Sequence, residues 1–156
     1  MRLKTAVQHA VKAYQEGESE ILEKLVAEEP GAMRYLLSMT YQDDPEKRNI
    51  AAKGIAFGSK HHPRLAKDLV RRLIWAMNDE SGTNALTAPD VLVVLAEVNP
   101  EILLPMVPDM TRLTADPGLK DGLTQTLETV AEKCPGQVGE RLSRSLKKRL
   151  RKGSAF

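Results

Sequence analysis

Residues 44–80 read DPEKRNIAAKGIAFGSKHHPRLAKDLVRRLIWAMNDE and predict two helices that fold back on each other. Asp44 belongs to the residue types that cap helices, and Pro45 suits the first helical position, because the N–H that proline lacks would have no partner there. Gly58 and the stretch Ser59–His62 are expected to end the first helix, and Pro63 to begin the second.

The first of these helices carries a narrow apolar stripe at helical spacing, made of Ile50, Ala51, Ile55 and Ala56. Gly54 lies within this pattern. A glycine in a helix interior costs about 1 kcal/mol relative to alanine. Its presence therefore indicates that a neighbouring helix approaches closely at this position.

The second helix has the clearest pattern in the chain. On a helical wheel one half holds the apolar residues Leu65, Ala66, Leu69, Val70, Leu73, Ile74, Ala76 and Met77. The other half holds Arg64, Lys67, Asp68, Arg71, Arg72 and Asn78. Only Trp75 breaks this partition, because it is aromatic and lies among the charged residues. So wide an apolar arc predicts a helix packed into a core, with one charged ridge left in water.

This stretch resembles a HEAT-like repeat, and is especially similar to the short type named after the phycobilisome lyases. The residues that carry the resemblance in the first helix are Asp44, Pro45, Glu46, Arg48, Ala51, Ala52, Ile55 and Gly58. Those in the second are Leu69, Leu73, Asp79 and Glu80. The resemblance implies a fold of stacked helix pairs and carries almost no information about function.

Prolines recur along the chain at the start of the second helix of each predicted pair: Pro30, Pro63, Pro100 and Pro135, spaced by 33, 37 and 35 residues. A helix pair that recurs at this length is typical of a solenoid, in which each unit buries its apolar face against its neighbours. We therefore expect one all-α domain over residues 1–156, a right-handed α-α superhelix (a HEAT-like solenoid). It would consist of an amino-terminal capping helix, 2–15, and four helix pairs, 18–41, 45–78, 87–113 and 117–151.

Three local patterns refine this expectation. In residues 18–28 the inward-facing residues should be Ile21, Leu22, Leu25 and Val26. Thr87 and Asp90 have the spacing of a capping box, and Asp116-Pro117 should start the next helix as Asp44-Pro45 does. Residues 100–113 should be short or kinked, because Pro105 and Pro108 cannot lie in an undisturbed helix interior.

The composition of the chain indicates the cellular compartment in which it folds. The single cysteine, Cys134, excludes a disulfide within the chain and fits a reducing compartment. There is no apolar run near the roughly 18 residues of a membrane span, and no signal-peptide pattern follows Met1. We expect a cytoplasmic protein with no membrane association.

The charge is unevenly distributed. Residues 134–156 hold seven Lys or Arg and one Glu, a charge of +6, whereas the rest of the chain has 16 basic and 20 acidic residues, a charge of −4. In the predicted last helix, four basic residues fall along one face: Arg141, Arg144, Lys148 and Arg151. Such a stripe is either a solvated outer cap of the solenoid or a phosphate-binding surface.

Catalytic and metal-binding patterns are weak. His61 and His62 are adjacent and do not project to one side as ligands at positions i and i+4 would. Cys134 precedes Pro135, so a helix N-terminus could lower its pKa, but a small apolar residue at a helix joint is the simpler interpretation. The chain has no glycine-rich phosphate loop and no H-E dipeptide, which argues against the metal-binding HEAT hydroxylases. We expect no catalytic residue, cofactor or metal.

The leading functional hypothesis is a scaffold that binds a protein partner on the surface formed by its second helices. The candidate binding residues are Tyr35, Arg64, Lys67, Arg71, Trp75, Asn78, Arg112, Arg141, Arg144 and Lys148. The alternative is a nucleic-acid-binding protein, because HEAT-like DNA glycosylases resemble this architecture and use a basic surface. A third hypothesis, a chromophore lyase or chaperone, rests on the name of the repeat alone.

Trp75 is the centre of the leading hypothesis and has two interpretations. Among arginines it has the composition of an interface hot spot and could equally stack on a base. Alternatively, its indole covers the joint with the next repeat or lies under the connection formed by residues 81–86. That connection is longer than the tight joint before Asp44, and insertions of this kind often serve binding.

Overall fold

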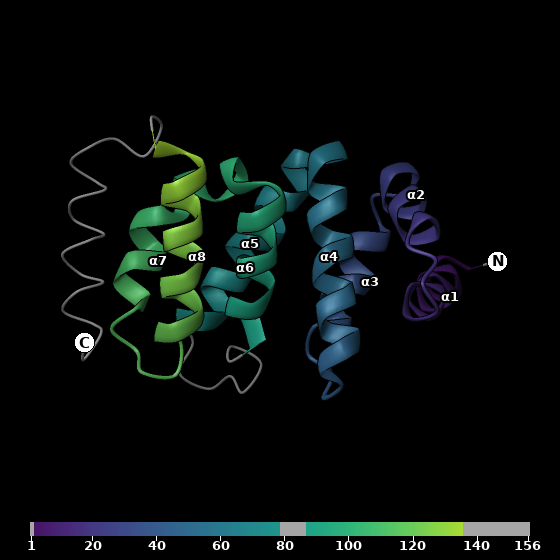
Figure 1. Cartoon of the computed structure of the whole chain (residues 1–156), viewed down its shortest axis with the longest axis horizontal. Coiled ribbons are helices and arrows are strands. Elements are labelled where there is room, and N and C mark those ends of the chain that lie inside the picture. The colour runs from purple at the N-terminus through teal and green to yellow at the C-terminus, as the bar shows by residue number, and fades with distance from the viewer. Residues whose placement is uncertain (1, 79–86, 136–156) are drawn as a thin grey trace. The chain divides into compact units, whose positions relative to one another are not determined.

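The computed structural model describes residues 2–78 and 87–135, and these residues form helices and turns with no strand (Figure 1). The all-α prediction is therefore confirmed. The connection 81–86 and most of the predicted last helix, with Arg141, Arg144 and Lys148, lie outside the described residues.

The backbone contacts divide the chain into two compact units, Met1–Leu69 and Val70–Phe156. The division falls within helix α5 (Pro63–Asn78). The superhelix that would join the two units remains a prediction.

The first unit contains four helices before α5. They are α1 (Leu3–Gln15), α2 (Glu20–Glu28), α3 (Ala32–Met39) and α4 (Pro45–His61). Helices α2 and α3 both pack against α4, and α1 packs against α2 and α3. Gly17 follows α1 with a φ of 95°, a conformation that glycine adopts without the steric cost of a Cβ atom, so the chain can turn sharply towards α2.

Helix α4 begins as the sequence predicts. The Asp44 side chain caps it: Oδ1 accepts the N–H of Glu46 at 3.0 Å and that of Lys47 at 3.4 Å. The predicted close approach at Gly54 is also confirmed. A Cβ atom there would lie 2.7 Å from Cδ1 of Leu36 and 3.2 Å from Cδ2 of Leu22.

The predicted end of α4 is correct in part: the helix ends at His61, within the stretch Ser59–His62 that was expected to end it, but Gly58 does not end it. Gly58 is instead buried inside the helix, where a Cβ atom would lie 2.8 Å from Sδ of Met33. Ile21 does not face inward but is 38% exposed. The reason is that α2 is short and buries only a narrow face, formed by Leu22 and Val26.

The partition predicted for α5 is confirmed residue by residue. Its buried residues are Ala66, Leu69, Val70, Leu73, Ile74 and Met77, with Leu65 and Ala76 half-buried. Its exposed residues, after Pro63, are Arg64, Lys67, Asp68, Arg71, Arg72, Trp75 and Asn78. Helical periodicity was sufficient to predict which side chains of α5 are buried, because its apolar arc is wide and unbroken.

The second unit contains the end of α5, α6 (Ala88–Val98), the 3₁₀ helix η2 (Pro100–Met106), α7 (Val107–Leu113) and α8 (Lys120–Lys133). Helix α6 packs along α8, and η2 contacts α6, α7 and α8. The prediction that residues 100–113 do not form one undisturbed helix is confirmed. Pro105 lies inside the 3₁₀ helix, and Pro108 lies in the first turn of α7, where its missing N–H costs little.

One helix start in the second unit differs from prediction. Asp116 does not begin α8; its Oδ1 accepts the N–H of Gly118 at 2.8 Å in a turn, and α8 starts at Lys120. The helix predicted after Thr87 is confirmed, because Thr87 is the N-cap of α6 and the helix ends at Val98, but the capping box itself is not formed. Thr87 already has helical backbone angles (φ −93°, ψ −14°), and its side chain makes no capping hydrogen bond.

Candidate functional site

The exposed side of α5 presents half of the candidate binding residues in one ridge. Arg64, Lys67, Arg71, Trp75 and Asn78 follow one another at spacings of three or four residues, and all are exposed. Side chains at these spacings share one side of a helix. The helix therefore presents them together to solvent.

Trp75 is the most exposed large apolar side chain of the described residues, with 75% of its surface accessible. An indole that covered a joint between repeats would be mostly buried, which does not agree with this exposure. The other interpretation, an indole under the connection 81–86, involves residues outside the described ones. An aromatic side chain held in water at the surface of a folded helix is unusual, because it forgoes the large burial energy that aromatic residues supply elsewhere.

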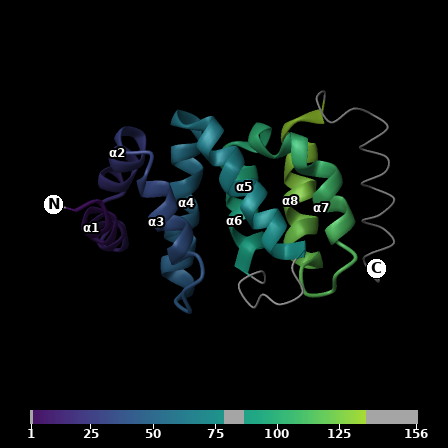
Figure 2. The same cartoon turned by 180° about the vertical axis from the view of Figure 1, so that it is seen from behind.

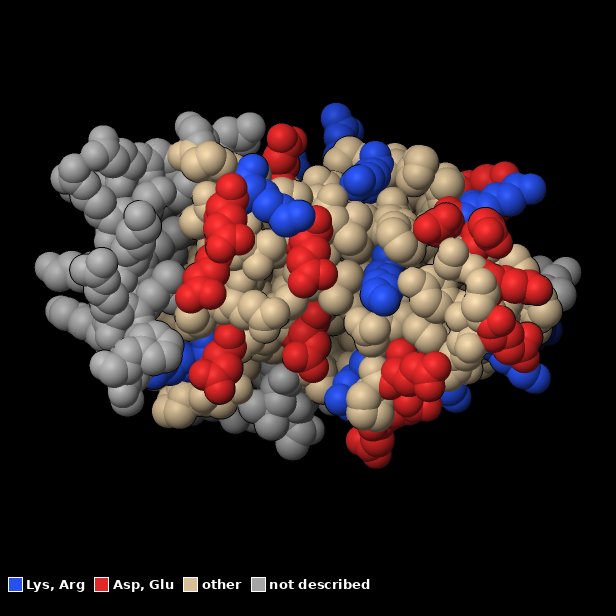
Figure 3. Space-filling view, viewed as in Figure 1, with Lys and Arg blue, Asp and Glu red and all other residues tan. Residues whose placement is uncertain are grey.

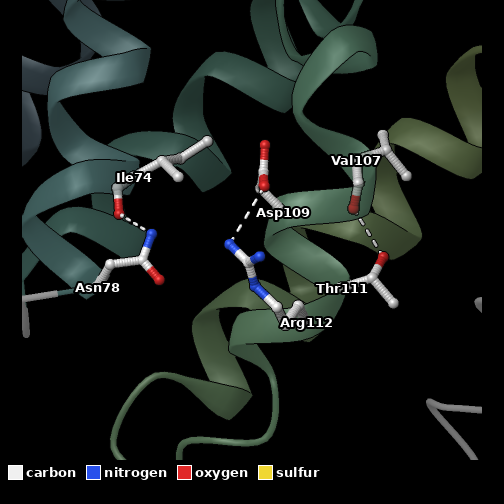
Figure 4. A network of polar contacts seen from close by, with 6 residues as sticks. All are labelled: Ile74, Asn78, Val107, Asp109, Thr111 and Arg112. Carbon is white, nitrogen blue, oxygen red and sulfur yellow. Dashed lines mark hydrogen bonds and ion pairs between the residues drawn. The ribbon is translucent and has the colours of Figure 1, made fainter.

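Arg112 adds a second arginine-bearing element to this side of the second unit. Helices α5 and α7 lie on the same side of the unit, with α6 and α8 behind them (Figure 2). The Arg112 side chain extends from α7 towards the last turn of α5, where Nδ2 of Asn78 donates to the Ile74 carbonyl oxygen at 3.2 Å (Figure 4).

Asp109 orients the Arg112 side chain and was missed by the sequence reasoning. Nη2 of Arg112 donates to Oδ1 of Asp109 at 3.2 Å, with side chains 65% and 42% exposed. An exposed pair of this kind contributes about 0.2–1 kcal/mol to stability, so its main effect is on orientation. The signal available in the sequence was the i, i+3 spacing of the two charges on one helix.

The opposite side of the second unit has the opposite charge. Acidic side chains run in columns over α6 and α8 (Figure 3). The exposed acidic residues of these two helices are Asp90, Glu97, Asp121, Glu128 and Glu132. Lys133 is an exception, and its Nζ donates to the Glu97 carbonyl oxygen at 2.9 Å. The α5–α7 side instead exposes Arg71, Arg72 and Arg112, so the described residues of this unit are polarised in charge.

The remaining candidates are not brought together with Trp75. Tyr35 is 40% exposed on α3, beside the exposed Arg34, and lies in the first unit. Arg141, Arg144 and Lys148 lie outside the described residues.

The histidine pair has a structural role at one of its two positions. Nε2 of His62 lies 2.9 Å from the Val26 carbonyl oxygen and, as a hydrogen bond to a carbonyl requires, donates to it. In the segments 2–78 and 87–135, no group of three or more His, Cys, Asp or Glu side chains is arranged to hold a metal ion.

Cys134 is buried at the end of α8. Burial raises the pKa of its thiol, and the nearby charge of Glu101 raises this pKa further. The hypothesis of a lowered pKa is therefore wrong, and the interpretation as a small apolar residue at a helix joint agrees with the structure.

Comparisons of the chain with protein-family models, with curated proteins and with solved structures find no match. No helix in the described part of the chain is long and apolar enough to cross a membrane.

Proposed function

We propose that this chain is a HEAT-like repeat protein that acts as an interaction module and binds a protein partner on the surface formed by its second helices. The observation that carries this proposal is the exposure of Trp75 in a ridge that also contains Arg71 and Asn78. Tryptophan and arginine are among the residue types enriched at interface hot spots.

The free energy of burying the Trp75 side chain favours association with a partner that covers it. Burial of a tryptophan side chain removes 150–250 Å² from water, and each Å² contributes about 25 cal/mol. Covering Trp75 therefore supplies several kcal/mol towards association, whereas leaving it exposed contributes nothing to the fold. The planar guanidinium group of arginine suits carboxylate groups, as the contact of Arg112 with Asp109 shows within the chain, so an acidic partner would compete for such contacts.

The polarised charge of the second unit supports a partner with an acidic binding surface. The α5–α7 side exposes three arginines, and the α6–α8 side exposes five acidic residues. An acidic partner is attracted to the first side and repelled by the second, which orients the encounter. We therefore place the partner's acidic and apolar groups against the α5–α7 side.

The experiment is an affinity purification from the native lysate with the wild-type chain and the Trp75→Ala variant in parallel. Partners that are identified by mass spectrometry are then purified, and their dissociation constants are measured. We expect the variant to bind the partner about 30-fold more weakly, which corresponds to about 2 kcal/mol. Ile21→Ala is the matched control, because it removes an exposed apolar side chain from the first unit. Equal affinity of Trp75→Ala and wild type would contradict the proposal.

Nucleic-acid binding is the second candidate, because an exposed tryptophan among arginines also suits base stacking beside phosphates. Binding of this kind weakens steeply with salt, with a log–log slope near −0.7 per phosphate contact on a single strand. We would titrate a fluorescent single-stranded oligonucleotide into the chain at about 50 mM salt and at about 200 mM salt. No binding at the lower salt concentration would remove this candidate.

A further inference from the structure

A pocket of about 400 Å³ opens on the surface of the first unit, between α1, the end of α3 and the start of α4. Its volume is within the range of about 300–1,000 Å³ that is typical of small-molecule sites. The apolar part of its wall is formed by Val11 and Met39. The polar part consists of three glutamines and two lysines, namely Gln8, Lys12, Gln15, Gln42 and Lys47.

The fold gathers these polar residues from three places. Gln8, Lys12 and Gln15 are spaced by four and three residues, so one side of α1 presents all three. Gln42 lies in the turn between α3 and α4, and its carbonyl oxygen accepts from Nη1 of Arg48 at 2.9 Å. This hydrogen bond holds the turn against α4. Lys47 is the third residue of α4 and is half-buried.

The pocket wall contains two lysines and, among the described residues, no acidic side chain. Neither Lys12 nor Lys47 forms an ion pair with a carboxylate of the described residues. Asp44 is close to Lys47 in sequence, but its Oδ1 turns back to accept two backbone N–H groups at the start of α4. Lys47 also lies in the first helical turn, where the helix dipole favours negative charge and disfavours a lysine.

We propose that this pocket binds a small molecule through a phosphate group. The two ammonium groups would neutralise the phosphate charge, as lysines do in other phosphate sites. The glutamine amides donate to phosphate oxygens, and their carbonyl oxygens accept from hydroxyl groups on the rest of the ligand. A bound anion would also offset the unfavourable interaction between the Lys47 ammonium group and the helix dipole. This site is independent of the surface around Trp75.

The experiment is a titration of the ¹⁵N-labelled full chain, followed by nuclear magnetic resonance, with inorganic phosphate, pyrophosphate and glucose 6-phosphate in separate arms. We expect the side-chain amide signals of Gln8, Gln15 and Gln42 to shift and to saturate. Tighter binding of glucose 6-phosphate than of the two inorganic anions identifies a phosphorylated metabolite as the ligand class. Tighter binding of the inorganic anions identifies free phosphate or pyrophosphate as the source.

Two variants and one control test the geometry. Lys12→Gln and Lys47→Gln should each weaken binding about tenfold, because each removes one ammonium group next to the phosphate. Lys4→Gln is the matched control, since Lys4 is exposed on α1 but does not line the pocket, and it should change affinity less than about twofold. The proposal is overturned if no signal saturates below about 10 mM ligand, or if Lys4→Gln weakens binding as much as the other two variants.

Discussion

A Cβ atom on Gly122 of α8 would lie 2.4 Å from Cβ of Pro89 on α6, closer than unbonded carbon atoms can approach. Glycine at this position is therefore what allows α8 to pack closely against the start of α6. The contact is between two helices that are neighbours in the second unit and that bury Leu92, Leu95, Leu123 and Leu127.

Gly122→Ala should destabilise the protein by about 1–3 kcal/mol, because the added methyl group meets a rigid proline ring. The gain in helix propensity, about 1 kcal/mol, offsets only part of this cost. Gly54→Ala should cost less, because the methyl group there meets the flexible ends of Leu36 and Leu22.

Free energies of unfolding, measured by urea titration, test this order of the two variants. Gln125→Ala, at an exposed position on α8, should change the free energy by no more than about 0.5 kcal/mol. A larger loss for Gly54→Ala than for Gly122→Ala would show that the α6–α8 contact can relax.

Asp44→Ala should reduce the free energy of unfolding by about 1 kcal/mol, within the range of 0.5–2 kcal/mol measured for lost caps. The reason is that the N–H groups of Glu46 and Lys47 lose their common acceptor. Asp43→Ala is the control, since it removes an exposed carboxylate one residue earlier, outside the capping contacts. Equal losses in the two variants would indicate that general charge, rather than the cap, is responsible.

Trp75 should fluoresce as an indole in water. It is the only tryptophan in the chain and is 75% exposed, so the emission reports on this position alone. We expect an emission maximum close to that of free tryptophan and efficient quenching by acrylamide. Trp75→Ala should change the free energy of unfolding by less than about 1 kcal/mol, whereas truncation of a buried tryptophan costs about 3–5 kcal/mol. Blue-shifted, quencher-protected emission would contradict the exposed position.

The thiol of Cys134 should react slowly with a thiol reagent in the native protein. Burial raises the pKa of this thiol, and Glu101 raises it further, so the reactive thiolate is scarce near pH 8. Because the pKa is higher in the folded state, the group's contribution to stability is complete below the unfolded pKa. It is lost as the pH rises towards the folded pKa.

The measurement is the rate of thiol modification with and without denaturant. We expect the rate to increase at least tenfold on unfolding. Glu101→Gln should increase the native rate by a smaller factor, because it removes only the lesser cause of the raised pKa. A native rate equal to the unfolded rate would show that the thiol is accessible.

The sequence alone determined the helical class and several helix boundaries. The start of α4 at Pro45 and the start of α5 at Pro63 follow from capping and proline chemistry, which involve only neighbouring residues. The buried and exposed sides of α5 follow from periodicity, because its apolar residues occupy half of the helix. The break at Pro105 has the same local origin.

Tertiary structure decided which residues within those helices meet other helices. Gly58 looks like a helix end in the sequence, but the close approach of Met33 from α3 explains the glycine, and α4 continues. Ile21 has the same apolar character as Leu22, yet the neighbours of α2 cover only one of the two. Lys12 and Lys47 are far apart in sequence and line one pocket only because α1 and α4 pack in the same unit. Periodicity and capping depend on residues within one or two turns, whereas burial and pocket formation depend on contacts between distant segments.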